Sequence, residues 1–200
     1  MNSETGKRGY QMVARAEAAA ATAERIMDAA VELFLEQPSD QMRLDEVAAR
    51  AGVTVQTVLR RFGSKEGLFS ATVERESTRV RDERGQVAPG DVQGAIANLV
   101  EHYEELGDLV IRLLAEEDRM PGLRMITDRG RALHRDWCQT VFEPFLAPLA
   151  DADRGRRLAQ LVAICDVYTW KLLRRDQGLS RVQTELALVE MLAPFTKEGS

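Results

Sequence analysis

The stretch AARAGVTVQTVLRRFGSKEGLF, residues 48–69, decides the fold of the first third of this chain and raises a question about charge. The 200-residue chain has a formal net charge of −5, yet no acid occurs between Val47 and Lys65. The charged residues of that interval are all basic: Arg50, Arg60, Arg61 and Lys65. We therefore expect this one segment of an acidic chain to face a negatively charged partner.

Two short helices joined by a glycine turn are predicted on this stretch. The first covers residues 44–51, and Gly52 suits the left-handed position that follows a helix. Thr54 is a suitable N-cap for the second helix, which is expected to end at Phe62. A pair of helices joined in this way is a helix-turn-helix, whose second helix is small enough to enter the major groove of DNA.

The two faces of the second helix differ in chemistry. Val53, Val58 and Phe62 are expected to pack it onto the first helix. The opposite face presents side chains that suit base edges and phosphates: Thr54, Gln56, Thr57, Arg60 and Arg61. A basic pair alone is more often simply solvated, but the turn, the spacing and the missing acids together predict DNA binding. Acids would be repelled there, because duplex DNA carries one charge per ~1.7 Å of its axis.

Residues 43–69, RLDEVAARAGVTVQTVLRRFGSKEGLF, resemble the DNA-binding domain of the tetracycline-repressor (TetR) family of transcriptional regulators. Residues 23–37, AERIMDAAVELFLEQ, resemble the first helix of that domain, and RALHRDW and WKLLRRDQGLS resemble parts of the C-terminal domain in some members. The resemblance implies an all-α fold: a three-helix DNA reader, then a ligand-receiving domain of about six helices, with a dimer built on the last two. The domains expected are a flexible arm at 1–21, a DNA-binding domain at 22–69 and a ligand-binding and dimerisation domain at 70–200.

The resemblance also assigns roles residue by residue. Lys65 matches the family's phosphate-contacting lysine, and Arg61 stands where the family usually has histidine or tyrosine. Leu59 replaces a tyrosine whose hydroxyl binds phosphate, so one common contact is in doubt. Gln56 replaces a frequent glycine and adds a side chain that can read adenine. The predicted DNA-binding set is Arg43, Thr54, Val55, Gln56, Thr57, Leu59, Arg60, Arg61 and Lys65, with Arg43 reaching a phosphate from a position that usually holds a Ser or Thr cap.

The composition of the chain is that of an ordinary globular protein, with 44% hydrophobic and 30% charged residues. Cys138 and Cys165 show no metal-ligand spacing, and His102 and His134 lack a second histidine at i+4, so neither a disulfide framework nor a metal site is predicted. No cofactor is expected. The N-terminus lacks a signal-peptide pattern and no apolar run reaches ~20 residues, which predicts a cytoplasmic protein.

The hydrophobic period stays near 3.6 beyond the helix-turn-helix, so the rest of the chain is expected to be helical. Thr22 is the predicted cap of the first helix, although the alanines before it can lengthen that helix backwards. A fourth helix is expected from Ser64 to Arg84, then a loop at 85–91. Further helices are predicted at 92–105, 108–118, 122–147, 153–177 and 181–195, the last with Ser180 and Gln183 as a capping box.

The last two predicted helices are apolar on more than one face, which indicates burial against a partner. A two-fold homodimer is therefore predicted. The candidate interface residues are Leu161, Ile164, Tyr168, Val182, Leu186, Val189 and Leu192. Such a dimer would hold two recognition helices about 34 to 36 Å apart and read a palindromic operator.

The small-molecule effector is unknown, and the sequence indicates its binding site less clearly than the DNA-binding site. Adaptable or amphipathic residues are candidates: Tyr103, Met120, Met125, His134, Trp137, Cys138, Tyr168 and Trp170. At helical spacing such residues belong to a core more often than to a pocket. Asp166, the only acid from Leu161 to Tyr168, is expected to pair with a cation of the partner chain or with nearby arginines.

The function predicted is a dimeric, ligand-responsive transcriptional repressor that releases DNA when a small molecule binds the C-terminal domain. Two alternatives stay open. A helical enzyme lacks any nucleophile, phosphate-loop, dinucleotide or metal motif in this sequence, so no enzymatic activity is predicted. A protein-interaction module, or an activator without small-molecule control, would share the helical pattern.

Overall fold

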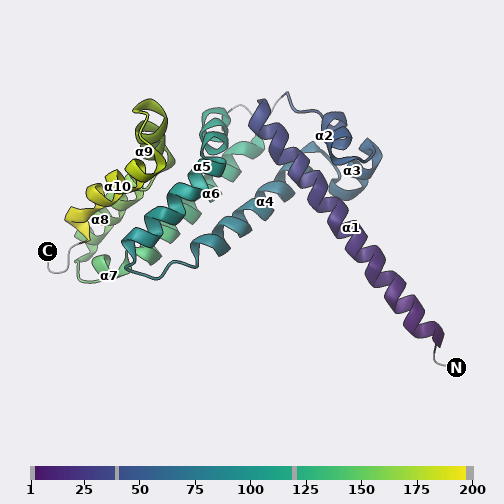
Figure 1. Ribbon diagram of the computed structural model, residues 1–200, viewed down its shortest axis with the longest axis horizontal. Coiled ribbons are helices and arrows are strands. Elements are labelled where there is room, and N and C mark those ends of the chain that lie inside the picture. Colours follow the sequence, from purple (N-terminus) through teal and green to yellow (C-terminus); the bar gives the residue numbers. More distant parts are fainter. Residues whose placement is uncertain (1–2, 39–40, 119–120, 197–200) are drawn as a thin grey trace. The chain divides into compact units, whose positions relative to one another are not determined.

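The computed structural model describes residues 3–38, 41–118 and 121–196, and these residues form helices, turns and loops without a strand (Figure 1). The elements are α1 (Ser3–Glu36), α2 (Leu44–Ala51), α3 (Val55–Phe62), α4 (Lys65–Arg84), α5 (Val92–Glu116), α6 (Pro121–Val141), α7 (Glu143–Leu146), α8 (Asp151–Ile164), α9 (Val167–Lys171), the π-helix η1 (Leu172–Asp176), α10 (Arg181–Leu192) and the 3-10 turn η2 (Ala193–Phe195). The all-α prediction is confirmed. The chain forms two compact units, residues 1–75 and 76–200, which divide within α4 rather than after Phe69.

The first unit has a small core to which all four of its helices contribute. Phe34 of α1 and Phe69 of α4 meet edge to face with ring centroids 4.7 Å apart, an arrangement that aromatic pairs prefer. Val47 of α2 and Val58 of α3 are fully buried. Arg75 of α4 donates to the carboxylates of α1, at 3.0 Å from Glu24 and 2.7 Å from Asp28.

The first helix is longer than the cap at Thr22 predicts. α1 begins at Ser3, so Thr22 lies inside it, and the Thr22 hydroxyl donates to the Ala18 carbonyl at 2.8 Å, one turn back. The alanine-rich run before Thr22 explains this, since alanine has the highest intrinsic helix propensity. The expected helix boundary is therefore wrong, and the alternative of an extended helix is the observed one.

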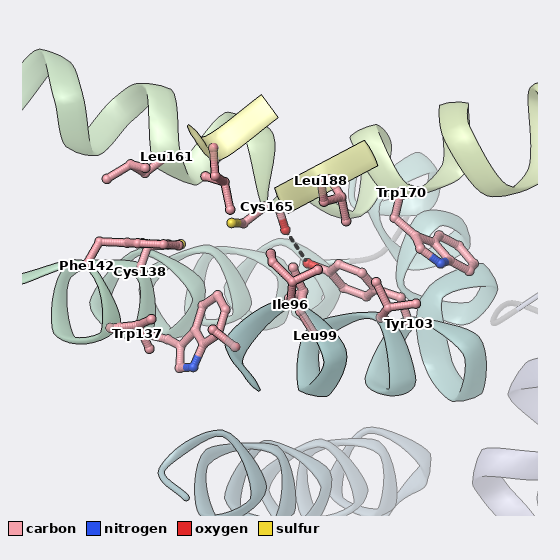
Figure 2. Packing of buried hydrophobic residues seen from close by; sticks show 14 of the residues in the cluster. Ile96, Leu99, Tyr103, Trp137, Cys138, Phe142, Leu161, Cys165, Trp170 and Leu188 are labelled. Carbon is pink, nitrogen blue, oxygen red and sulfur yellow. Dashed lines mark hydrogen bonds between the residues drawn. The ribbon is translucent and has the colours of Figure 1, made fainter. Parts of the chain in front are cut away.

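The second unit is a bundle in which α5 packs against α6, α9 and α10, and α8 packs against α6 and α10. Its core contains Leu99, Phe142, Leu161 and Leu188, drawn from α5, α8, α10 and the residue after α6 (Figure 2). The phenol of Tyr103 lies inside this core and donates to the Cys165 carbonyl at 3.1 Å. A buried tyrosine hydroxyl thus has the partner that burial requires.

The helix boundaries of this unit differ from the sequence prediction in three places. The predicted helices at 92–105 and 108–118 are one helix, α5. The predicted helix at 122–147 ends at Val141, because Pro144 cannot donate the backbone bond that would continue it. The predicted helix at 153–177 stops at Ile164, and Asp166 restarts the chain as the N-cap of α9 by accepting from Tyr168 N at 2.9 Å.

Within the described part of its own chain, Asp166 caps a helix and does not pair with a nearby arginine, and its pairing with a cation of a partner chain stays a prediction. Its carboxylate caps a helix and forms no ion pair with a described residue. At the other end of the unit, the predicted capping box of α10 is confirmed, with Gln183 N 3.3 Å from the Ser180 hydroxyl and Ser180 N 3.0 Å from the Gln183 carbonyl oxygen. Of the helices in the described ranges, none combines the length and the apolar character needed to cross a membrane.

Candidate functional site

The turn between α2 and α3 is a sharp reversal built on Gly52. Gly52 has φ +66°, a left-handed conformation that residues with a side chain rarely adopt. Its amide donates to the Ala49 carbonyl at 3.2 Å, and the Val53 amide donates to the Ala48 carbonyl at 2.9 Å. These bonds satisfy carbonyls that would otherwise be left over at the end of α2.

The recognition helix α3 is fixed at both ends. The Thr54 hydroxyl accepts from Thr57 N at 3.2 Å and lies 3.0 Å from the Thr57 hydroxyl. Val58 is fully buried on the inner face. At the other end, Gly63 donates its amide to the Leu59 carbonyl at 2.8 Å with φ +78°. The two-turn helix predicted from the sequence is thus confirmed to the residue.

Gly67 positions α4 against the end of α3, a role that sequence reasoning missed. A Cβ at residue 67 would lie 2.0 Å from the Phe62 carbonyl oxygen, and that oxygen cannot move as a side chain can. Glycine alone permits so close an approach. The Ser64 hydroxyl accepts from Gly67 N at 3.1 Å, as an N-cap does, so the signal in the sequence was a glycine three residues after a serine cap.

The outer face of α3 carries the predicted contact residues. Thr54, Val55, Gln56, Arg60 and Arg61 are exposed. Thr57 and Leu59 of α3 and Lys65, the first residue of α4, are half-buried. Among the described residues, no acid pairs with Arg60 or Arg61. The guanidinium groups of Arg60 and Arg61 can donate hydrogen bonds to phosphates. The exposed amide of Gln56 can both donate to and accept from a base edge.

Two other arginines near this face are paired. Arg43 forms a bidentate pair with Asp45, with 3.0 Å at each nitrogen, which lowers the pKa of that carboxyl. Arg50 binds Glu36 of α1 at 2.7 and 2.8 Å and so joins α2 to α1. The basic residues between Val47 and Lys65 are thus not equivalent, because the charge of Arg50 is neutralised by Glu36 within the first unit. Arg43 would have to exchange Asp45 for a phosphate, and since the pair is exposed, that exchange costs little.

The effector candidates in the second unit fall into two groups. Tyr103, His134, Trp137 and Cys138 are buried and lie in one neighbourhood around Arg84, which the sequence analysis did not single out. Met125 and Tyr168, at 70% and 49% exposed, lie apart on the surface. The remaining candidates are a fully buried Trp170, whose indole N–H donates to Glu104 at 3.2 Å, and Met120, which lies outside the described residues.

The interface candidates are also divided by the structure. Tyr168, Val182 and Leu186 are exposed at 49%, 72% and 57%, and Ile164 and Val189 are half-buried. Leu161 and Leu192 are not on this surface, because both are fully buried in the core of their own unit. Two apolar side chains that were not predicted, Leu172 at 55% and Met191 at 42%, are exposed on the same C-terminal helices.

The first unit is similar in sequence to the DNA-binding part of known bacterial regulatory proteins. Residues 26–72 match the family model for bacterial regulatory proteins of the tetR family. An uncharacterised HTH-type transcriptional regulator of Mycobacterium tuberculosis is 36% identical over 84 residues, which are 42% of this chain and 38% of the length of that relative. An HTH-type transcriptional repressor of the same organism is 27% identical over 168 residues, 78% of each chain.

Comparison of structures extends the likeness to the second unit. The chain of a SmeT–triclosan complex superposes with a TM-score of 0.70 at 22% identity, covering 90% of this chain and 93% of that one. The likeness shows a shared fold over both units. The helix-turn-helix and the match at residues 26–72 show that the first unit carries a DNA-binding domain of the tetR family of bacterial regulatory proteins.

Proposed function

We propose that this chain is a ligand-responsive repressor that binds a palindromic operator as a homodimer in the cytoplasm. The observation that carries the proposal is the outer face of α3, where Gln56, Arg60 and Arg61 are exposed and no described acid pairs with the two arginines. Arginine contacts to phosphate supply affinity, whereas a glutamine can distinguish adenine in the major groove. The repressive sign is supported by the relative that is named a transcriptional repressor.

The homodimer is supported by the apolar side chains exposed on α9, η1 and α10. Val182, Leu186 and Leu172 are more than half exposed, although each is large and apolar. Exposed apolar side chains on neighbouring C-terminal elements are typical of an interface, and a two-fold contact would cover them. The two recognition helices of such a dimer are expected to fit half-sites about 34 to 36 Å apart.

Control by a small molecule is supported by the buried polar neighbourhood of Tyr103, His134 and Trp137 in the second unit. A protein of similar fold has been solved as a complex with triclosan. α4 runs from Lys65 to Arg84 as one helix and therefore connects the DNA-binding unit to the second unit by continuous backbone. A ligand that binds better to the DNA-incompetent state would shift the population toward it.

Selection of bound fragments from random duplex DNA, followed by sequencing, tests the proposal directly. We expect an inverted repeat, and fluorescence anisotropy with that repeat should give an affinity that falls steeply with salt. Analytical ultracentrifugation of Leu186→Glu and Val182→Glu should show monomers and a loss of operator binding. Recovery of no DNA sequence would support an interaction module instead, and operator binding by a monomer would contradict the homodimer.

A further inference from the structure

Arg84, the last residue of α4, is a buried arginine. Its residue is only 7% exposed, and its guanidinium carbon lies 5.0 Å from the ring centre of Trp137 and 5.8 Å from that of Tyr103. Its Nη1 lies 3.5 Å from Nδ1 of His134. Because Nε2 of His134 lies 3.2 Å from the Val162 carbonyl and donates to it, Nδ1 is the acceptor that faces Arg84.

No described acid neutralises Arg84. Three carboxylates of α4 and α5, those of Glu76, Glu83 and Glu105, pair with Arg79 instead, at 3.0 to 3.3 Å. Arginine stays charged in proteins, so burial without a counter-charge is costly, and buried charges are normally paired or bind a ligand. Rings and a neutral imidazole offset only part of that cost.

The buried polar atoms without a partner gather around this same residue. Among the described side chains they are Arg84 Nε, Asn98 Oδ1, His102 Nδ1 and Trp137 Nε1. Asn98 and His102 are one turn apart on α5, and the Asn98 amide nitrogen donates to the Glu83 carbonyl at 3.3 Å, next to Arg84. Native proteins leave few such atoms unsatisfied, so a group of them indicates a site for a polar ligand.

The positive charge of Arg84 also affects the pKa values of neighbouring titratable groups. Burial, and then the charges of Arg84 and Arg79, lower the pKa of His102 to about 3, so this imidazole is neutral near pH 7. The Cys138 thiol is hydrogen-bonded to the Cys165 thiol, and this coupling lowers the pKa of Cys138 and raises that of Cys165. The charge of Arg84 adds a smaller effect, which lowers the pKa of both His102 and Cys138.

We propose that the second unit binds an organic monoanion, with a carboxylate against the Arg84 guanidinium and an apolar or aromatic body against the rings of Trp137 and Tyr103. The unpaired Nε of Arg84 and Nε1 of Trp137 are donors for the acid oxygens, and Oδ1 of Asn98 is an acceptor for a hydroxyl or amine of the ligand. The inference rests on the proposed function in one respect only, that this anion is the effector.

Calorimetric titration without DNA tests the anion. The probes are benzoate, 1-naphthoate and octanoate, each with its primary amide, which keeps the body and removes the charge. We expect at least one acid to bind and to exceed its amide at least tenfold. Arg84→Met should abolish the preference for that acid, whereas Arg175→Met should keep it, because Arg175 also covers a tryptophan, Trp170, but pairs with Asp108.

A second measurement separates ligand binding from a structural role. If Arg84 is kept for a ligand, Arg84→Met should raise the midpoint of thermal unfolding of the unliganded protein, and 1-naphthoate or another bound acid should stabilise only the wild type. The proposal is overturned if no acid binds at millimolar concentration, if acids and amides bind alike, or if Arg84→Met lowers the midpoint and leaves binding unchanged. An acid that binds without releasing the operator would instead contradict the effector role and leave the site standing.

Discussion

Two tryptophans of the second unit lie under an arginine, and their surroundings differ in charge. Arg175 lies 4.5 Å above Trp170 and is neutralised by Asp108, at 3.1 and 3.2 Å. The Trp170 indole N–H donates to Glu104, which also binds Arg174 at 2.8 Å. Around Trp137, in contrast, Arg84 has no described counter-charge and the indole N–H has no partner. Around Trp170 the indole N–H and both arginines have acid partners within the chain, whereas around Trp137 the indole N–H and Arg84 have none among the described residues.

The same contrast separates the arginines of the first unit. Arg50 and Arg75 are paired with acids of α1 and hold helices together. Arg60 and Arg61 have no described acid and face outward from α3. In both units, therefore, arginines without a described acid, Arg60 and Arg61 in the first and Arg84 in the second, lie at the sites proposed to bind a ligand, whereas Arg50, Arg75 and Arg175 are used within the fold.

The largest expected effect lies in the satisfied region. A Cβ at Gly107 of α5 would lie 2.6 Å from the Trp170 ring, which is fully buried and cannot move away. Gly107→Ala should therefore lower the free energy of unfolding by about 3 kcal/mol, as overpacking does. Urea denaturation followed by circular dichroism measures this change.

Gly130 provides the matched control for that substitution. It lies inside α6, is exposed, and has nothing within 4 Å of an added Cβ. Gly130→Ala should raise the free energy of unfolding by up to about 1 kcal/mol, because alanine favours the helix. If both substitutions had the same sign, close packing of Gly107 on Trp170 would not be the reason for that glycine.

The next effect is the pH dependence of stability that His102, near Arg84, is expected to cause. The pKa of His102 is about 3 in the folded chain, against 6.5 when exposed, and the charged or titratable groups acting on it are Arg84, Arg79 and His134. Since the unfolded chain takes up the proton first, stability is full above pH 6.5 and falls as the pH drops toward 3. Between pH 7.5 and 5.0 the wild type should lose about 2 kcal/mol more than His102→Leu in urea titrations.

The anion site adds a specific expectation to this pH dependence. A bound carboxylate beside Arg84 would raise the pKa of His102 by offsetting the positive charge. The loss of stability between pH 7.5 and 5.0 should therefore shrink when a binding acid is present. An unchanged pH profile in His102→Leu would show that other groups cause the acid sensitivity.

A smaller effect, on binding rather than stability, separates the arginines of the first unit. Arg60→Ala and Arg61→Ala should each weaken operator binding roughly fivefold to tenfold and reduce the salt slope by about one, as loss of a phosphate contact does. Arg50→Ala should leave the salt slope unchanged, because Glu36 already holds that charge. Equal slopes for all three variants would remove the distinction between paired and unpaired arginines.

The sequence predicted the helix-turn-helix to the residue because its signals are local. Gly52, Thr54 and Gly63 act on their immediate neighbours, so spacing alone located α2 and α3. The second unit was predicted less well because its determinants are distant in sequence. The prediction ended one helix at residue 105 and began the next at 108, whereas α5 continues through Gly107, and the contact that requires glycine there comes from Trp170, 63 residues later. Arg84 was read only as a helix end, since its burial depends on α5 and α6.

Asp166 gives the smallest effect and tests how a satisfied polar group contributes to stability. It was expected to pair with a cation of the partner chain or with nearby arginines, and within this chain its carboxylate accepts from Tyr168 N at 2.9 Å and restarts the helix that carries Trp170. Asp166→Ala should cost about 1 kcal/mol of unfolding free energy, the usual effect of removing an N-cap. Asp176→Ala removes a carboxylate that only pairs with Lys171 at the surface, so its cost should stay below about 0.5 kcal/mol. If the two substitutions cost the same in urea titrations, the cap at α9 contributes no more than a surface ion pair.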